Sequence, residues 1–513
     1  MNVADALDRN TIFFPDNEAL VNRDRRWTYA EFRRDADRFA HALTELGVVK
    51  GDRVCLFMGN CAEFAIAFYG ILKVGAIAVS ISSMCKCEEV EFMATDSGAR
   101  ILVAGGAYLD EVPAREAMAN IESVVAVESE EGSLPTGLEG VDHGFWEIME
   151  GHSVFFETVY TDRDDGAEII YTSGTTGKPK GVVLTHGNVV SNTNATVHLT
   201  GMSHEDRLIC FLPLYHSFAQ NFIFNSSVNV GSTLVILPKF ELDQVLETLK
   251  RERITRWHAV PTIYIMMLDA PGMEEAFATV RYCFSAASSM PGEVARQWKE
   301  RLGLPINEGY GLTESTPSAT YNHQFRHKEG SIGTPIENVE VQIWSDDDEP
   351  LPRGEVGQIV IKGPNVMKEY YNNPQATAET LVNGWLKTGD VGVEDEEGYF
   401  SIVDRLKDMV NSAGLKIWPR EVEEVIYRLS AVSECAVVGR PDPVFGESVV
   451  ACIVVRAGES LDEDEVVSFC KEHIASYKAP KNVEFMDQLP KSATGKILKT
   501  ELRETVRGSG GSS

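Results

Sequence analysis

The chain has 513 residues, 43% apolar and 24% charged, which is ordinary for a globular enzyme of roughly two to four domains. With 77 acidic and 47 basic residues its formal charge is −30, which disfavours broad contact with nucleic acid or an anionic membrane surface. The nine cysteines contain no CxxC pair, so we expect neither a zinc site of that kind nor a disulfide framework, and they fit a reducing compartment, the cytoplasm.

Neither a signal peptide nor an integral membrane segment is expected from the sequence. The first residues, Met1–Ala6, lack the basic and apolar regions of a signal peptide. The most apolar stretch, Phe64–Ser83, is divided by Lys73 and Gly75 into a helix followed by a strand. The last six residues, 508–513, have the composition of a flexible tail.

Helices and strands alternate through the first half of the chain. Thr28 and Glu31 form a capping box, and apolar residues at steps of four and three then predict a helix that ends at Gly47. Further strands are predicted at residues 53–57, 75–81, 101–103, 124–127, 207–212 and 233–237, and further helices at 62–72, 222–230 and 242–251. This alternation predicts parallel sheets with helices outside them.

The pattern of predicted helices and strands changes in the second half of the chain. A strand-like, turn-rich pattern at residues 354–362 indicates a small β lobe, and helices and short strands then alternate over the last hundred residues. We therefore predict an α/β fold: residues 1–404 form a large domain of parallel-rich sheets with the β lobe, residues 405–507 form a smaller, mobile α+β domain, and residues 508–513 form the tail.

A loop of glycines, hydroxyls and lysines lies between two apolar runs, residues 168–171 and 182–184. Its glycines allow left-handed turns and close approach of the backbone to a ligand. Its candidate phosphate-binding residues are Thr172, Ser173, Gly174, Thr175, Thr176 and Lys180. Pro179 follows Gly177 and Lys178, so the loop is not a Walker A motif, which requires Ser or Thr and a helix start at that point.

The string Tyr171–Asn188 resembles the signature of the adenylate-forming superfamily, which comprises acyl-CoA synthetases, firefly-type luciferases and peptide-synthetase adenylation domains. The resemblance implies a large N-terminal domain with a mobile C-terminal lid. It also implies that the protein binds ATP, Mg²⁺ and CoA and acts on a small carboxylic acid. A homodimer is possible under this resemblance.

Later motifs extend the resemblance to the nucleotide site. In Asn307–Glu314, the family pattern implies that Tyr310 stacks on adenine, Thr313 lies near the phosphates and Glu314 helps to hold Mg²⁺. The rest of that site would comprise Ala286, Ala287, Glu308, Gly309, Gly311, Asp390 and Arg405, with Asp390 and Arg405 at the ribose. Glu308 stands where relatives often carry glutamine.

The resemblance also assigns residues that move with the lid. Lys407 matches the hinge residue, and Lys496 matches the lysine that bridges the substrate carboxylate and the α-phosphate. Gly414, with Lys416 close to it, lies on the segment that faces the site when the thiol enters. That segment reads Ser412-Ala413-Gly414 where relatives carry Ser-Gly-Gly or Ser-Gly-Phe.

The expected acyl pocket is small and apolar. His216 resembles a gating residue, although a histidine among apolar residues is equally often a satisfied core residue. The expected pocket walls are Phe218, Phe222, Pro317 and Ser318, with Thr262 and Met266 nearby. Because no lysine or arginine accompanies them, we expect an uncharged tail.

These features predict an AMP-forming ligase that activates a carboxylic acid, a medium- to long-chain fatty acid, as acyl-AMP and then transfers it to CoA. An aryl-CoA ligase of benzoate or cinnamate type is the alternative acid specificity. A stand-alone enzyme that loads a carrier protein, or a luciferase-like oxygenase, would share only the adenylation step. A non-catalytic homologue would not need Lys496, Glu314 and Asp390.

Overall fold

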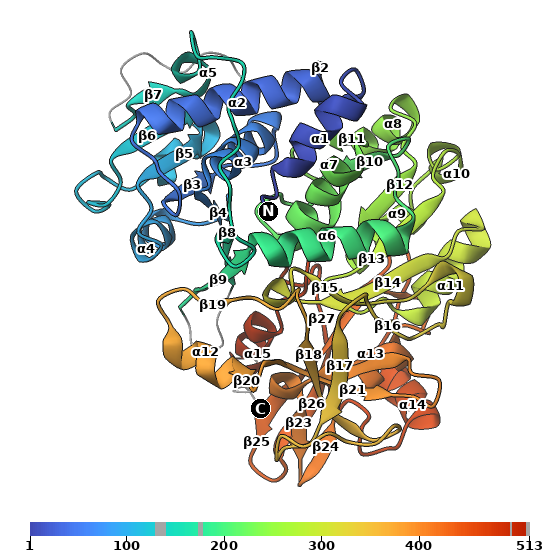
Figure 1. Cartoon of the computed structure of the whole chain (residues 1–513). Coiled ribbons are helices and arrows are strands. Elements are labelled where there is room, and N and C mark those ends of the chain that lie inside the picture. Colours follow the sequence, from blue (N-terminus) through green and yellow to red (C-terminus); the bar gives the residue numbers. More distant parts are fainter. Residues whose placement is uncertain (129–139, 173–177, 493–494, 509–513) are drawn as a thin grey trace.

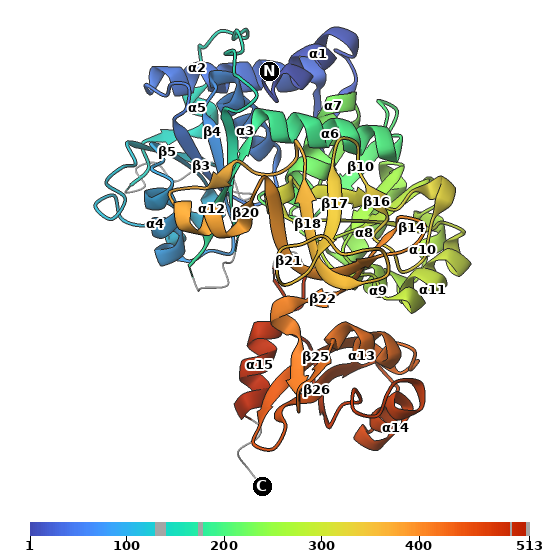
Figure 2. The same cartoon turned by 60° about the horizontal axis from the view of Figure 1, so that its bottom comes forward.

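The computed structural model describes residues 1–128, 140–172, 178–492 and 495–508. Most of the chain forms a large body with two wide sheets and a smaller third sheet (Figure 1). The C-terminal residues form a separate, smaller body that joins the large one below β22 (Phe400–Arg405), as Figure 2 shows. Within the described ranges, no helix is both long and apolar enough to cross a membrane.

The first wide sheet has the strand order β19-β9-β8-β4-β3-β5-β6-β7, and its strands run parallel from β8 to β7. Its strands are β3 (Arg53–Phe57), β4 (Ile77–Ile81), β5 (Ile101–Gly105), β6 (Ser123–Val127), β7 (His143–Gly144), β8 (Gly166–Thr172), β9 (Lys180–Thr185) and β19 (Glu369–Tyr370). The accompanying helices are α2 (Tyr29–Glu45), α3 (Ala62–Val74), α4 (Cys87–Asp96), α5 (Phe145–Ile148) and the 3₁₀ helix Gly106–Glu111. The predicted capping box is present at the start of α2, where the Thr28 side chain accepts from the Glu31 N–H.

The second wide sheet has the order β16-β15-β14-β13-β12-β10-β11-β1-β2 and is parallel from β14 to β1. Its strands are β1 (Glu18–Asn22), β2 (Arg25–Thr28), β10 (Arg207–Cys210), β11 (Thr233–Ile236), β12 (Arg256–Ala259), β13 (Tyr282–Ser285), β14 (Ile306–Gly311), β15 (Ser318–Tyr321) and β16 (Thr334–Pro335). Its helices include α1 (Asp5–Phe13), α7 (Ser226–Val230), α8 (Leu242–Arg251), α9 (Pro261–Leu268), α10 (Met273–Ala276) and α11 (Gly292–Leu302), with 3₁₀ turns Thr313–Ser315 and Gln324–Arg326.

Helix α6 (His186–Thr200) passes between the two wide sheets, in contact with β8, β9 and β15 (Figure 1). The sequence pattern did not predict it, because buried positions occur on all its sides and no single apolar stripe marks a helix. A π-helix, Phe218–Asn225, packs against α6 and runs directly into α7. The single α-helix predicted at 222–230 is therefore two helical segments of different geometry.

A buried polar network fixes the π-helix to β8. Asn221 Nδ2 donates to Glu168 Oε1 at 2.8 Å, and Gln220 Nε2 donates to the other oxygen of the same carboxyl group. Ser80 Oγ of β4 in turn donates to Gln220 Oε1 at 2.9 Å. Burial raises the pKa of Glu168 to about 8, so this group stays protonated and uncharged at neutral pH.

The third sheet is the predicted β lobe, with β22 paired to β21. Its elements are β17 (Glu340–Trp344), β18 (Val356–Lys362), α12 (Pro374–Thr380), β20 (Leu381–Val382), β21 (Trp385–Glu394) and β22. The smaller body follows through the 3₁₀ turn Leu406–Asp408. It contains β23 (Val410–Ser412), β24 (Leu415–Ile417), α13 (Pro419–Ile426), β25 (Val432–Asp442), β26 (Gly446–Val455), α14 (Glu463–His473), β27 (Asn482–Phe485) and the unpredicted α15 (Lys499–Gly508).

Candidate active site

The two ends of the predicted phosphate loop lie side by side on paired strands. Thr172 at the end of β8 is the register partner of Lys180 at the start of β9, so the two strands that flank the loop are paired. Ser173, Gly174, Thr175 and Thr176 lie outside the described residues. The Lys180 ammonium lies 4.9 Å from the centre of the Tyr370 ring, which places a positive charge at the foot of the loop.

Tyr370 connects this loop to the second predicted motif. Its hydroxyl donates to Glu314 Oε1 at 2.7 Å, so Glu314 and Lys180 lie on either side of one tyrosine. Glu314 offers a single carboxylate, and no group of three or more His, Cys, Asp or Glu side chains could hold a metal ion among the described residues. One carboxylate fits Mg²⁺ that is held mainly by substrate phosphates and water.

Tyr310, Asp390 and Arg405 form a continuous chain of polar contacts. The Tyr310 hydroxyl donates to Asp390 Oδ2 at 2.7 Å, and Asp390 Oδ1 lies 3.0 Å from Arg405 Nε. Asp390 is on β21 of the large body, and Arg405 is the last residue of β22, next to the smaller body. The sequence motifs at these three positions therefore converge on one site, although their order in the chain spans almost a hundred residues.

Close packing shapes the backbone around Tyr310. A Cβ atom on Gly311 would lie 1.6 Å from the Pro317 carbonyl oxygen, and one on Gly309 would lie 2.8 Å from the Phe284 ring. Thr313 is buried, with its hydroxyl 3.4 Å from that of Ser217. Ala287 has a φ of 72°, in the left-handed region where glycine is favoured.

Glu308 faces the smaller body. Burial raises its pKa to about 7, against the opposing charge of Arg420 at the start of α13. Arg420 itself donates to the Ile402 carbonyl at 2.7 Å, so it is anchored at the junction of the two bodies. Glu308 thus contributes to a contact between the bodies that the sequence did not predict.

The smaller body inserts Lys496 into the site. Gly495, with a φ of 78°, packs so closely that an added Cβ would lie 2.9 Å from Thr262 Oγ1 and 3.1 Å from Val260 Cγ2. Burial, aided by Arg405, lowers the pKa of Lys496 to about 8, while Asp390 opposes this shift. The charge of Lys496 also helps burial to lower the pKa of His216 to about 4. Lys496, Arg405, Asp390 and His216 therefore share one electrostatic environment.

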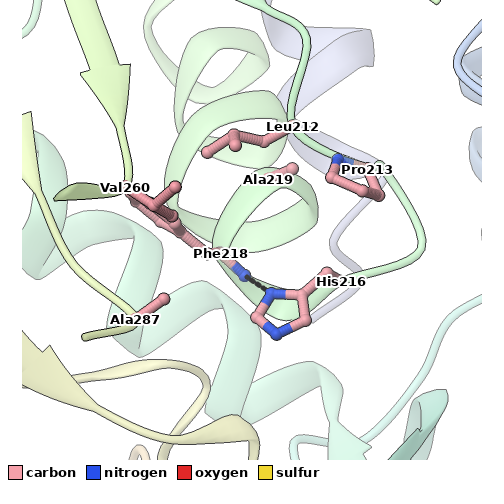
Figure 3. A pocket seen from close by; sticks show the side chains of 7 residues that line it. All are labelled: Leu212, Pro213, His216, Phe218, Ala219, Val260 and Ala287. Carbon is pink, nitrogen blue, oxygen red and sulfur yellow. Dashed lines mark hydrogen bonds between the residues drawn. The ribbon is translucent and has the colours of Figure 1, made fainter. Parts of the chain in front are cut away.

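A narrow apolar pocket lies beside His216 (Figure 3). Its lining residues are Leu212, Pro213, His216, Phe218, Ala219, Val260 and Ala287. His216 Nδ1 accepts from the Phe218 N–H at 3.3 Å, so the ring proton of the neutral imidazole is on Nε2.

Other residues expected at the pocket lie elsewhere. Phe222 is not one of the lining residues: its ring is stacked on Phe284, with centres 4.3 Å apart, and lies 5.6 Å from the ring of the lining residue Phe218. Pro317 and Ser318 belong to the packed turn below Gly311, where the Ser318 carbonyl accepts from Asn192. Met266 is partly exposed and lies one turn after Thr262 on α9, and its expected place near the pocket stays a prediction.

The remaining lid residues are exposed. Gly414 ends the turn between β23 and β24 with a φ of 83°, and an added Cβ there would meet no atom within 4 Å. Lys416 is exposed on β24, and Lys407 is exposed in the 3₁₀ turn after β22. This arrangement brings Lys496 to the site and leaves the Gly414 hairpin in solvent.

Three contributors to the site had no signal in the sequence. Tyr370 contacts Glu314, Ser217 contacts the Thr313 hydroxyl, and the charge of Arg420 acts on Glu308 from the smaller body. Each depends on tertiary contacts between distant segments. A tyrosine or arginine in such segments is otherwise indistinguishable from an ordinary surface residue.

Known proteins match the chain over almost its whole length. AMP-binding enzymes match residues 7–371, and the C-terminal domain of AMP-binding enzymes matches residues 421–496. The chain belongs to the AMP-binding enzyme family. Among this family's members, the long-chain-fatty-acid–CoA ligase FadD13 of Mycobacterium tuberculosis is 37% identical over 508 residues, which are 98% of each chain.

Solved structures of this AMP-binding family share the fold. The anthranilate CoA ligase AuaEII, in complex with anthranoyl-AMP, superposes with a TM-score of 0.92 at 29% identity, covering 99% of this chain and 98% of its own. ATP-bound MatB from Rhodopseudomonas palustris gives a TM-score of 0.90 at 30% identity and 99% coverage of both. The predicted adenylate-forming superfamily, α/β fold class and AMP-forming acid–CoA ligase class are thus confirmed.

Proposed function

We propose that this AMP-binding enzyme is an ATP-dependent acyl-CoA ligase for a medium- to long-chain fatty acid. In the first step, a carboxylate oxygen of the acid attacks the α-phosphorus of ATP, which forms acyl-AMP and releases pyrophosphate. In the second step, the sulfur of CoA attacks the acyl carbon and AMP leaves. The observation that carries this proposal is the convergence of Lys496 with Asp390, Arg405 and His216 beside an apolar pocket.

The first step needs positive charge at the transferring phosphate. Lys496 is proposed to bridge the acid carboxylate and the α-phosphate, with His216 Nε2–H directed at the carboxylate. Tyr310 would lie against the adenine of ATP, and Asp390 and Arg405 would bind its ribose. The Thr172–Lys180 loop and Thr313 would bind its phosphates. Glu314 would hold Mg²⁺, which neutralises phosphate charge when it is bound.

The acid pocket supports a neutral tail. Its lining contains no lysine or arginine, and nothing there would balance a second carboxylate. An aryl acid is the second candidate, because Phe218, Phe222 and Phe284 form successive ring contacts at the back of the pocket. Flat rings pack as well against such a surface as alkyl chains do.

The second step requires the lid to turn. We propose that residues 405–507 rotate about Lys407 against residues 1–404, which withdraws Lys496 and brings the Gly414 hairpin with Lys416 to the channel for CoA. All nine cysteines are unpaired, which supports the proposed cytoplasmic location.

The proposal is tested by AMP release from ATP and Mg²⁺ with a panel of aliphatic and aromatic acids, each measured with and without CoA. Turnover that requires CoA and peaks at medium to long alkyl chains is expected. A peak at aromatic acids would replace the fatty acid by the aryl candidate. Slow adenylation that is indifferent to CoA would instead indicate a carrier protein as the acceptor.

A further inference from the structure

His258 is a buried histidine whose ring nitrogens have no hydrogen-bond partner among the described residues. Its side chain is fully enclosed, and both Nδ1 and Nε2 are unsatisfied. Burying a polar group without a partner destabilises a protein, and such groups are rare in native interiors. An unsatisfied imidazole at a fixed position therefore needs an explanation.

The position of His258 is one layer behind the acyl pocket. It lies on β12, two residues before the pocket residue Val260, so both side chains point to the same face of the sheet, about 7 Å apart along the strand. The rings of Phe218 and Phe222 are 5.6 Å apart, and those of Phe222 and His258 are 5.8 Å apart. A line of contacts thus runs from the pocket wall, past Phe222, to His258.

The charges around His258 favour a neutral ligand. Burial, with Arg256 nearby, lowers the pKa of His258 to about 3, so the imidazole is neutral and offers one N–H donor and one acceptor nitrogen. Arg256 is the nearest cation on the strand, but its Nε lies 2.8 Å from Asp206, which pairs its charge. A second carboxylate on the substrate would find no free cation here, whereas a hydroxyl could both donate and accept.

We propose that His258 is a specificity-determining residue that hydrogen-bonds a hydroxyl group on the tail of the acid. The inference rests on the proposed ligase function and narrows its substrate to an acid hydroxylated at the depth of His258, on an alkyl chain or on a ring. To reach His258, the tail must displace the Phe222 ring from its stack on Phe284 and so extend the narrow pocket past Phe218.

Matched pairs of acids test this proposal. The pairs are octanoate with 8-hydroxyoctanoate, decanoate with 10-hydroxydecanoate, and cinnamate with 4-hydroxycinnamate, and the readout is kcat/KM for CoA-dependent AMP release. The wild-type enzyme should prefer the hydroxylated member of at least one pair by about tenfold, because only that member satisfies the imidazole. The aliphatic and aromatic pairs show whether an alkyl chain or a ring carries the group.

The decisive variant is His258→Phe, which keeps a ring in the aromatic cluster and removes both nitrogens. It should lower kcat/KM for the hydroxylated acid about tenfold and leave the value for the unsubstituted acid unchanged or higher. His258→Leu is the second variant, and the melting temperature of both should not fall, since each removes an unsatisfied polar group. Tyr282→Phe is the matched control, because it removes a hydroxyl from the same cluster that already contacts Tyr321 at 3.0 Å.

Two results would overturn the proposal. One is a wild-type preference for the unsubstituted member of every pair, and the other is a hydroxyl preference that persists in both His258 variants. In either case the imidazole serves only as a packed ring, and the ligase function stands. The absence of turnover with every acid would overturn the ligase function and this subsite together.

Discussion

Lys496 is a half-buried ammonium whose pKa burial lowers to about 8, close to the pH at which enzymes work. Its charge is present below that pKa and is lost as the pH rises through it. Because kcat/KM for ATP reports groups of the free enzyme, we expect this ratio to fall above about pH 8. Lys496→Arg should move that decline to higher pH, and a wild-type profile that stays flat to about pH 9.5 would contradict the assignment.

Lys496→Ala separates the two half-reactions. Adenylation, measured as pyrophosphate release, should fall roughly 100-fold or more, which is the scale of losing one preorganised charge-stabilising donor. Thioester formation from supplied acyl-adenylate should largely survive, because the proposed lid rotation withdraws Lys496 before that step. Equal losses in both measurements would refute the role.

Gly311 tests the packing under Tyr310. An alanine Cβ there would lie 1.6 Å from the Pro317 carbonyl, so Gly311→Ala must displace the turn that carries Pro317 and Ser318. We expect a clearly lower melting temperature and the loss of most adenylation, as overpacking costs about 1–3 kcal/mol or more. Gly354→Ala is the control for backbone strain alone, since no atom lies within 4 Å of its added Cβ while its φ of 84° still disfavours alanine.

Among the elements, those with local signals were predicted from the sequence, and those defined by their surroundings were not. The capping box at Thr28 and the strand at residues 53–57 follow from spacing alone, and both are present. Helix α6 has no apolar stripe because it lies between two sheets, and α15 buries little besides Leu502 and Val506. The site motifs converge as expected, but Tyr370 and Arg420 join them through contacts that only the folded chain creates.

The π-helix leads to a prediction about stability and pH. The pKa of Glu168 is raised to about 8 in the folded protein, against 4.5 for an ordinary glutamate, so the unfolded chain releases this proton first. Stability from this group is therefore full below about pH 4.5 and declines as the pH rises towards about 8.

Glu168→Gln should remove that decline: its amide oxygen still accepts from Asn221, and its NH2 group donates to Gln220 once the Gln220 amide turns over, with Ser80 Oγ then accepting from Gln220. Its melting temperature should exceed that of the wild type at pH 8 and differ less at pH 5. The expected difference in the free energy of unfolding at pH 8 is roughly 1–3 kcal/mol, the cost of an unsatisfied buried polar group. Thermal melts at the two pH values measure this difference. Parallel pH dependence in both proteins would show that Glu168 does not titrate in this range.

At the scale of the whole molecule, an ion pair joins the two bodies. Arg456 Nη1 of the smaller body lies 2.9 Å from Asp269 Oδ2 of the large one, in the arrangement that buries Lys496. Arg456→Asp should shift the lid away from this arrangement and slow adenylation about two- to fivefold, the range of an exposed ion pair. The double variant with Asp269→Arg should restore the rate, and failure of this rescue would mean that the pair does not hold the lid.

Val260 is touched from two sides. Its side chain lines the acyl pocket, and Gly495 of the lid packs against the same residue. A change in the position of Val260 would therefore affect both the pocket and the closed lid, and any such coupling between acid binding and lid closure is reciprocal. We expect a tail that packs well against Val260 to tighten the binding of ATP, and ATP to tighten the binding of that acid by the same factor.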